Sequence, residues 1–257
     1  MAPGPATKEE RDYLAFPPDR QANVDVVGTA FAAVPGPKSY LTMPVTTGRR
    51  FYAVLEAHDV RSLDHLLRVA PAALREEIIL PNIAGSVEAA RGISARSAYP
   101  LVVPGVFEGR AQRWSQSEYM CLWMRLITRE IREVHLLDGW EYSNGGAQEY
   151  ARAILLRHAC LDARREPMSV LDERGEPVPM ERGAGMLADA VLDLRQRGFD
   201  APDLVRELSR LGGFAAMLAW GDRHEWGRHV GPVGHLDAWA VVDACRSGGA
   251  VPHYSLH

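Results

Sequence analysis

The fold of this chain is decided by one stretch, Val134-His-Leu-Leu-Asp-Gly-Trp-Glu-Tyr-Ser-Asn-Gly-Gly-Ala-Gln-Glu149. It opens with a short apolar run, which predicts a buried strand that ends at Asp138. A polar loop follows, and Ser143 or Asn144 is placed to cap a helix that we expect to run from about Gly146. A strand, a loop and a helix in this order are typical of the units that build parallel sheets.

Similar patterns recur on both sides of this stretch. Short apolar runs predict further strands, and between them apolar residues at helical spacing predict helices. This alternation predicts an α/β fold, a flavodoxin-like or Rossmann-like parallel sheet with helices on both faces. The expected strands are 24–27, 39–43, 100–104, 134–137 and 168–171, and the expected helices are 49–58, one or two within 59–80, 83–95, 115–132 and 146–159.

The pattern also predicts three regions. Residues 1–23 are rich in proline and charge and are expected to form an N-terminal arm. Residues 24–182 carry the α/β pattern, with an insertion at about 59–82 in the first crossover. Residues 183–257 form an extension that is mainly helical, with helices expected at 186–197 and 202–220.

Composition restricts the class of protein. The 257 residues are 47% hydrophobic and 24% charged, which is typical of a globular protein. The 29 Lys and Arg residues against 33 Asp and Glu residues give a net charge of -4, which argues against nucleic acid as a partner. No apolar run approaches the roughly 20 residues of a membrane helix, so no membrane association is expected. Three dispersed cysteines favour a reducing, cytoplasmic location.

Glu149 is the residue to which this pattern assigns chemistry. Helix side chains lean toward the N-terminus, so its carboxylate is directed at the space that Gly145 and Gly146 leave open. The positive end of the helix dipole favours its ionised form. A carboxylate beside such a notch suits a nucleophile at a sugar anomeric carbon. The residue types alone nevertheless favour an ordinary exposed helix residue, because Gly-Gly-x-x-Glu is weakly specific.

A resemblance to a known family shifts that balance. Gly139-Trp-Glu-Tyr-Ser-Asn-Gly-Gly-Ala-Gln-Glu149 resembles the strand–loop–helix signature of the nucleoside 2-deoxyribosyltransferase superfamily, and is most similar to its nucleoside 5'-monophosphate N-glycosidase branch. Tyr40-Leu-Thr-Met-Pro44 with Thr47-Gly48 resembles the first strand and loop of that family, and Tyr119-Met120 its helix entry. The resemblance covers roughly residues 39–172 and leaves the C-terminal third outside it.

The resemblance implies an enzyme that cleaves the bond between a base and a sugar. Glu149 would be the nucleophile, Tyr40 would orient it, and Ser143 would contact the ribose or phosphate. Gly48, Arg49 and Arg50 would lie near a 5'-phosphate. The same resemblance implies a nucleoside or nucleoside monophosphate substrate, no cofactor or metal, and a homo-oligomer. The loop residues Asn144, Gly145, Gly146, Trp140 and Tyr142 complete the substrate-binding set that we expect.

One departure from the family pattern concerns the general acid. Many relatives have Asp four residues after the equivalent of Tyr119, whereas this chain has Trp123. Asp138 or Glu141 could replace that acid, and we assign Asp138 to the catalytic set. The departure also favours a second hypothesis, a nucleotide-sensing module without catalysis. Two further hypotheses are base exchange by a 2-deoxyribosyltransferase and a structural partner protein that works through its C-terminal helices.

Several further residues admit two interpretations. Arg49 and Arg50 are suited to clamp a phosphate by paired hydrogen bonds, or to be a solvated helix start. Trp140 and Tyr142 are equally suited to stack on a base or to pack in the loop, whereas packing is favoured for Trp123. Residues 112–116 lie where a loop would edge the same cleft. The C-terminal histidines, His224, His229 and His235, match no common zinc spacing.

Overall fold

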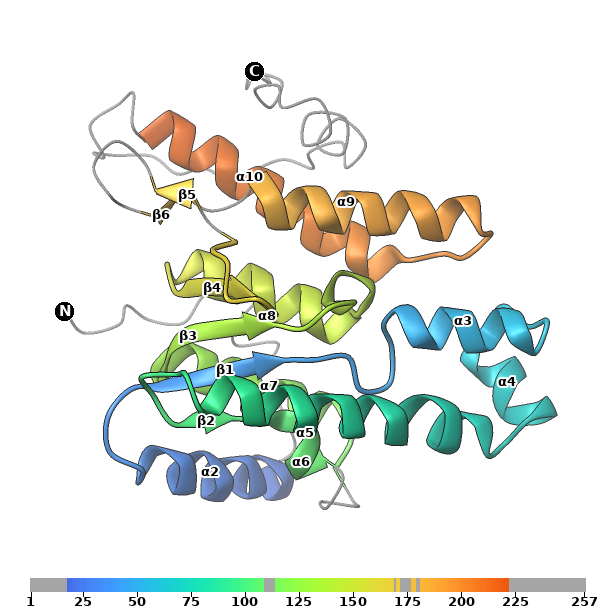
Figure 1. The fold of residues 1–257 in the computed structure, drawn as a ribbon, viewed down its shortest axis with the longest axis horizontal. Helices are drawn as coiled ribbons and strands as arrows, with labels where there is room; N and C mark the ends of the chain where they lie inside the picture. Colours follow the sequence, from blue (N-terminus) through green and yellow to red (C-terminus); the bar gives the residue numbers. More distant parts are fainter. Residues whose placement is uncertain (1–17, 109–113, 169, 172–176, 179–180, 222–257) are drawn as a thin grey trace.

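The computed structural model describes residues 18–108, 114–168, 170–171, 177–178 and 181–221 (Figure 1). Its centre is a four-stranded parallel sheet of β1 (Lys38–Thr42), β2 (Leu101–Val102), β3 (Ile131–Leu136) and β4 (Ala159–Asp162). The strand order is β2-β1-β3-β4, so the chain leaves β1 first toward one edge and later toward the other. The predicted α/β fold, flavodoxin-like with a parallel sheet, is therefore confirmed.

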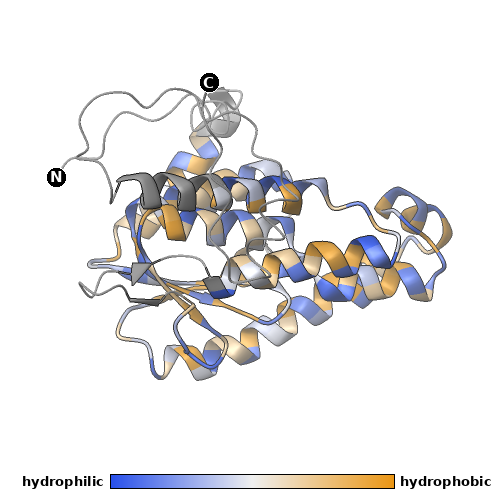
Figure 2. Ribbon diagram, turned by 90° about the horizontal axis from the view of Figure 1, so that it is seen from above, coloured by the Kyte–Doolittle hydropathy of each residue, from blue (hydrophilic) through white to orange (hydrophobic). Residues whose placement is uncertain are grey.

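Helices cover both faces of this sheet. Tyr40 of β1 points to the face on which α7 (Gln116–Arg129) and α8 (Asn144–Leu155) pack side by side. The preceding residue, Ser39, points to the other face and bonds Ser97, directly after α5 (Leu80–Ser94). Apolar and polar residues alternate along the helices (Figure 2), as expected for helices that pack one face on a sheet and expose the other to solvent.

The register places one row of apolar side chains across the sheet. Tyr40 pairs with Val102 on one side and with Val134 on the other, and Val134 pairs with Cys160. Residues in such a row of a parallel sheet project to the same face. All four are buried, so this row is the floor on which α7 and α8 pack.

The predicted strand at 24–27 is wrong. These residues lie inside the helix α2 (Pro18–Ala32), which packs on α7. Val24 is fully buried and Val26 is 71% exposed, whereas Val27 and Phe31 pack against the core. Spacings of three and four residues are helical, and the valine-rich composition concealed them. Gly28 lies within this helix and faces Leu122.

The fourth strand was also predicted in the wrong place. The helix α8 ends at Leu155, and Arg157 has a positive φ of 56°, which stops the helix. The strand β4 therefore begins at Ala159, where we expected the helix to end. The predicted strand at 168–171 contributes only β5 (Val170–Leu171), which pairs antiparallel with β6 (Pro177–Val178) in a separate ribbon.

The insertion in the first crossover is helical, as expected. After α3 (Arg49–Ala57) come α4 (Leu63–Val69) and a turn of π-helix, η1 (Leu74–Ile79), which continues directly into α5. The π-helical turn precedes Pro81, which has no backbone N–H to donate inside a helix. These elements project beyond the carboxyl ends of the strands (Figure 1).

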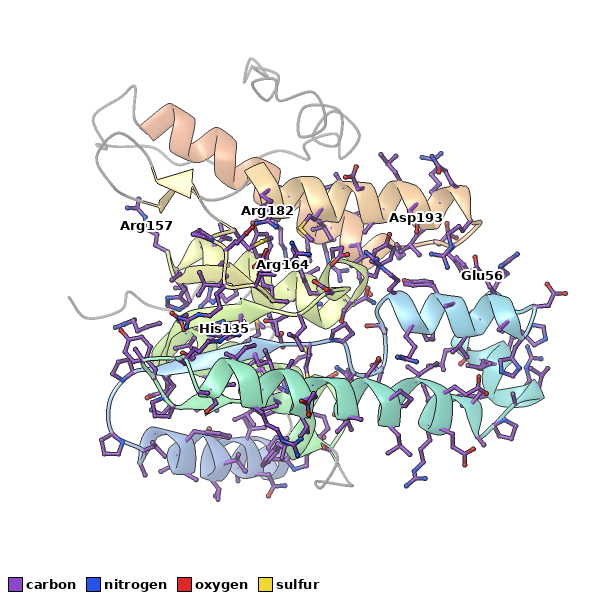
Figure 3. The ribbon with its side chains drawn as sticks, in the orientation of Figure 1. Glu56, His135, Arg157, Arg164, Arg182 and Asp193 are labelled. Carbon is purple, nitrogen blue, oxygen red and sulfur yellow. The ribbon has the colours of Figure 1, made fainter. Side chains whose placement is uncertain are left out.

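Two C-terminal helices follow, close to the expected positions. The helix α10 (Pro202–Gly221) packs on α8, and α9 (Glu181–Gln196) packs on α10 and on the loop before α8, with Gly183 against Tyr150 of α8. Arg197, which follows α9, donates hydrogen bonds of 2.8 Å to both carboxylate oxygens of Glu56 in α3 and one of 2.9 Å to Asp193. Figure 3 labels these two acidic residues on their helices. The remaining elements are α6 (Pro104–Glu108) and the 3-10 turn η2 (Trp140–Tyr142). Of the arm predicted at 1–23, residues 18–23 instead begin the helix α2, and residues 1–17 lie outside the described residues, as do the C-terminal histidines.

We predict that a methyl group at Gly183 separates α9 from α8. A Cβ built at Gly183 would lie 2.1 Å from the Tyr150 hydroxyl oxygen, whereas one at Gly185 would meet nothing within 4 Å. Gly183→Ala is expected to lower the free energy of unfolding by about 1–3 kcal/mol. Gly185→Ala, in the same helix, should leave it unchanged or raise it by up to about 1 kcal/mol. Urea denaturation measures both, and equal effects would contradict this packing.

We also predict that stability falls on mild acidification. Burial lowers the pKa of His135 and of His158, whose Nε2 lies 2.7 Å from the Ile127 carbonyl oxygen. Below the ordinary pKa of about 6.5 the unfolded chain binds protons that the native imidazoles resist, so stability present above that pH is lost as pH falls toward the native values. His158→Gln should reduce this slope between about pH 7 and 5, measured by urea denaturation.

Candidate active site

A buried hydrogen bond between strand β1 and helix α8 forms the centre of the site. The Tyr40 hydroxyl donates to the Glu149 carboxylate at a distance of 2.7 Å. Tyr40 is fully buried and Glu149 is 5% exposed. Tyr40 projects from the row described above, and its ring packs at a centroid distance of 6.2 Å from that of Trp123. The hydroxyl that orients Glu149 is therefore fixed by both a strand and a helix.

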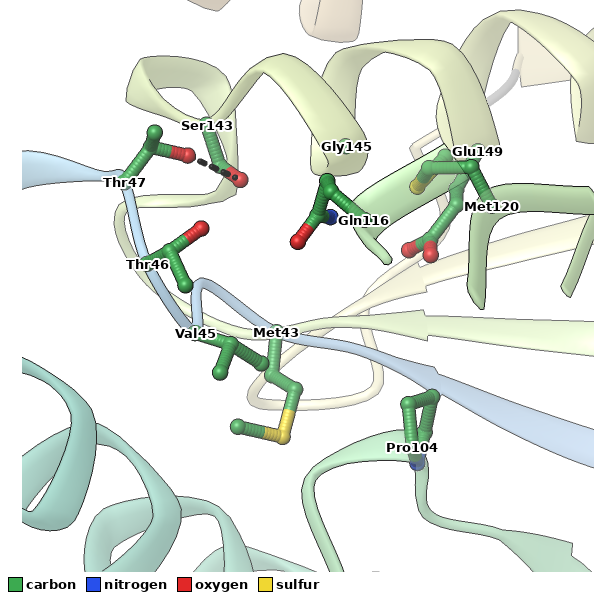
Figure 4. A pocket seen from close by; sticks show the side chains of 10 residues that line it. All are labelled: Met43, Val45, Thr46, Thr47, Pro104, Gln116, Met120, Ser143, Gly145 and Glu149. Atoms are coloured by element: carbon green, nitrogen blue, oxygen red, sulfur yellow. Dashed lines mark hydrogen bonds between the residues drawn. The ribbon is translucent and has the colours of Figure 1, made fainter. Parts of the chain in front are cut away.

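Glu149 lines a cavity beyond the carboxyl ends of β1 and β2. The enclosed part of the cavity is small, about 30 Å³, which is enough for one or two water molecules, and the cavity opens to solvent. The Glu149 carboxylate faces this space (Figure 4). We name it the Glu149 cavity, and its lining residues are Met43, Val45, Thr46, Thr47, Pro104, Gln116, Met120, Ser143, Gly145 and Glu149.

The position of the cavity follows from the topology of the sheet. The chain leaves β1 and β3 toward opposite edges, and ligands of open parallel sheets bind where strand connections diverge in this way. The loop after β1 supplies Thr46 and Thr47, and the first turns of α7 and α8 supply Gln116 and Gly145. Polar groups from three separate segments thus surround one carboxylate.

The beginning of α8 is fixed by Ser143. This residue is the N-cap, because its hydroxyl accepts a hydrogen bond of 3.3 Å from the Gly146 amide. The same hydroxyl lies 3.1 Å from the Thr47 hydroxyl, which ties the loop after β1 to α8 (Figure 4). The N-cap, for which Ser143 and Asn144 were both candidates, is therefore Ser143.

The two glycines of the signature have different surroundings. Gly145 lines the cavity, and a Cβ there would meet the Met120 sulfur at 3.4 Å and the Met120 methyl carbon and Ser143 hydroxyl at 4.0 Å, all ordinary contacts. A Cβ at Gly146 would lie 2.7 Å from the Trp140 carbonyl oxygen. Gly145 therefore leaves space for a ligand, whereas Gly146 allows the loop and the helix to pack closely.

Several predicted binding residues do not reach the Glu149 cavity. Trp140 is buried against the Tyr150 ring at a centroid distance of 4.5 Å. Asn144 donates a hydrogen bond of 2.8 Å to Asp203 of α10. Gly48 is buried with a φ of 98°, and a Cβ there would lie 2.5 Å from Pro44. These three residues hold the walls of the site together, and the structure does not bring them to its interior.

Arg49 is engaged in a local ion pair. Its guanidinium donates a hydrogen bond of 2.7 Å to Glu141 and lies over the Tyr142 ring, 4.8 Å from the centroid. Glu141 and Tyr142 are buried. Burial raises the pKa of the Tyr142 hydroxyl, and nearby Asp193 raises it further. The interpretation of Tyr142 as packing is therefore favoured over base stacking.

Asp138 is not brought together with Glu149. It is exposed, and with Arg49 and Arg50 it lines a neighbouring groove on the other side of Met43. Glu141, the other candidate acid, is held by Arg49. Glu149 is thus the one titratable side chain among the described residues that line its cavity. Trp123 lies in the core, as favoured, and supports the ring of Tyr40.

Three residues that line the cavity had no role, or only a weakly indicated one, in the sequence analysis. Thr46 was not assigned a role, and Thr47 was identified only as part of a loop that resembles the family, although the chain leads directly from the strand of Tyr40 to both residues. Gln116 falls in the segment 112–116 that was expected to edge the cleft, and α7 begins at this residue, directly after its N-cap Ser115. Hydroxyl and amide groups in turns follow no period, so no signal distinguished them.

No protein-family model, curated protein or solved structure matches this chain. The family resemblance therefore stays a prediction. Among the residues that the structure describes, no helix is long and apolar enough to cross a membrane. No group of three or more metal-ligating side chains occurs in the same ranges.

We predict different roles for the two neighbouring arginines. Arg49→Gln removes the charged partner of the buried Glu141 carboxylate, so we expect a loss of about 1–3 kcal/mol in the free energy of unfolding. Arg50 is exposed and donates a hydrogen bond of 3.2 Å to Asn82. Arg50→Gln should change stability by less than about 0.5 kcal/mol. Thermal and urea denaturation of both variants test this difference, which disappears if Arg49 is only a solvated helix start.

Proposed function

We propose that this chain is an N-glycosidase that cleaves the base–sugar bond of a nucleoside 5'-monophosphate or nucleoside. The observation that carries the proposal is the Glu149 carboxylate, buried on the wall of an open cavity and oriented by a tyrosine hydroxyl 2.7 Å away. A neutral phenol orients the carboxylate without neutralising its charge. This arrangement supports a nucleophile better than an ion pair would.

The reaction proceeds in two steps. A Glu149 oxygen bonds to C1' of the sugar while the C1'–N bond breaks, and the base leaves with the electron pair and takes a proton from water. Water or hydroxide then attacks C1' of the glycosyl ester, which releases the sugar and regenerates the carboxylate. The net reaction consumes one water molecule for each base released. Base exchange would replace water in the second step by a second base.

The other cavity groups bind the substrate. Thr46, Gln116 and Ser143 present hydroxyl and amide groups that suit sugar hydroxyls. Met120 and Pro104 provide the apolar part of the wall. Asp138 has no part in this mechanism, because it lines the neighbouring groove.

A nucleotide-sensing module is the second candidate function. It is favoured by the lining of the cavity, in which Glu149 is the one titratable group that the described residues provide. A leaving base would then lack a protein acid, which slows its departure. Binding of nucleotides without release of base would establish the sensing module.

We predict that base release depends on both members of the hydrogen bond. Glu149→Gln should lower the rate by at least about 1,000-fold, because the amide is not a nucleophile. Tyr40→Phe keeps the ring but loses the hydroxyl, and should lower kcat by about 10–100-fold. Chromatography of free base from a panel of nucleosides and nucleoside monophosphates measures these rates.

The control is Glu88→Gln, which changes an exposed carboxylate on α5 and should retain the wild-type rate. Circular dichroism and thermal denaturation show whether each variant folds. Undiminished release by Glu149→Gln, or no release by the wild-type protein from any compound, would reject the glycosidase.

A further inference from the structure

A larger groove adjoins the Glu149 cavity. It lies between α3, α5 and the loops that follow β1, β3 and β4, and it has a volume of about 630 Å³ and is open to solvent. We name it the α3–α5 groove. Its lining includes Met43, Arg49, Arg50, Asn82, Gly85 and Ser86.

Met43 is the boundary between the two hollows, because its side chain lines both. The side chain is 6% exposed and is directed at α6 and α5: a Cβ at Gly105 would lie 2.7 Å from its terminal methyl carbon. A methionine side chain is unbranched and adopts several rotamers at low cost. Its rotation would join the cavity to the groove.

The stereochemistry of nucleotides requires two such spaces. A nucleophile that displaces the base attacks C1' from the face of the sugar opposite the base. In a β-nucleotide the base and the 5'-carbon project from the same face. With Glu149 in its cavity below the sugar, both substituents must lie on the other side of the ring. The α3–α5 groove is the space adjacent to the cavity, across Met43.

The lining of the groove is suited to both substituents. The α5 wall presents Gly85, Ser86 and Ala89, whose small side chains leave room for a planar ring. The Ser86 hydroxyl donates a hydrogen bond of 2.7 Å to the Ile83 carbonyl oxygen of its own helix. The opposite wall, at the start of α3, carries Arg49 and Arg50.

Arg50 is the available cation for a phosphate. Its Nε donates to Asn82, which leaves its two amino groups unpaired among the described residues. Arg49 is held by Glu141. Asp138 also lines the groove and is exposed to solvent. A guanidinium with two unpaired amino groups matches the geometry of phosphate oxygens.

We propose that the α3–α5 groove is the subsite for the base and 5'-phosphate of a β-nucleotide, and that Met43 is the gate between this subsite and the nucleophile. This inference rests on the proposed function, which places the sugar beside Glu149. It assigns the inserted helices a role, because the segment η1–α5 forms one wall of the subsite.

Gly85 provides a test at a position that lies outside the proposed catalytic residues. A Cβ at Gly85 would meet nothing within 4 Å, so a larger side chain enters the groove without disturbing the helix. Gly85→Trp fills the groove, and Gly85→Ala is the matched control, because both replace a helical glycine and only Trp is large. Calorimetric titration with ribo- and deoxyribonucleoside 5'-monophosphates gives the dissociation constant, and the Glu149→Gln background prevents turnover.

We expect Gly85→Trp to weaken nucleotide binding at least about tenfold and Gly85→Ala to change it less than about twofold. Equal binding by both variants would overturn the subsite, and base release by the wild-type chain would then still support the glycosidase. Weakened binding by Gly85→Trp without any base release by the wild-type chain would support the subsite and reject the glycosidase. Failure of every nucleotide to bind would overturn the subsite.

Discussion

The hydrogen bond between Tyr40 and Glu149 is the constraint on which the site depends. It joins the central strand of the sheet to the helix that begins at the signature loop, across 109 residues of sequence. For this bond to form, β1 must direct Tyr40 toward α8. The N-cap Ser143 must also start α8 at a position that brings Glu149, about one and a half turns later, opposite the tyrosine. Trp123 supports the ring from α7. Much of the architecture thus serves to hold one carboxylate at the edge of a cavity.

The parts of the fold that could be predicted from sequence have a clear local pattern. Two strands are short runs rich in apolar residues, one before Asp138 and one that contains Tyr40. The helix α7 has apolar residues at helical spacing. The parts that failed lack one. Val24 to Val27 have the composition of a strand, and only their burial shows a helical face. The strand β4 could not be predicted because the end of α8 depends on the left-handed conformation of Arg157. Arginine is not a residue type that indicates such a conformation.

Prediction of the site was limited by what neighbouring residues do in space. Arg49 and Arg50 are adjacent in sequence, yet one is held by Glu141, 92 residues away, and the other lies open in the groove. Trp140 and Tyr142 carry the ring chemistry that suits a base, but tertiary packing buries both. The helix pattern directed the Glu149 carboxylate at the space beside the two glycines, and the family resemblance implied Tyr40 as its neighbour; the structure joins the two by a hydrogen bond. It did not show on which side of Met43 each loop residue would fall.

The contact between Asn144 and Asp203 has a consequence for how this architecture can vary. The first residue of α8 is bonded to the start of α10, and α9 fits against Tyr150 only because Gly183 has no side chain. The C-terminal helices therefore support α8, the helix that carries Glu149, through direct contacts. If a related chain lost or exchanged these helices, the residues of α8 that contact them would also have to change. We therefore expect α8 and the C-terminal helices to change together in evolution.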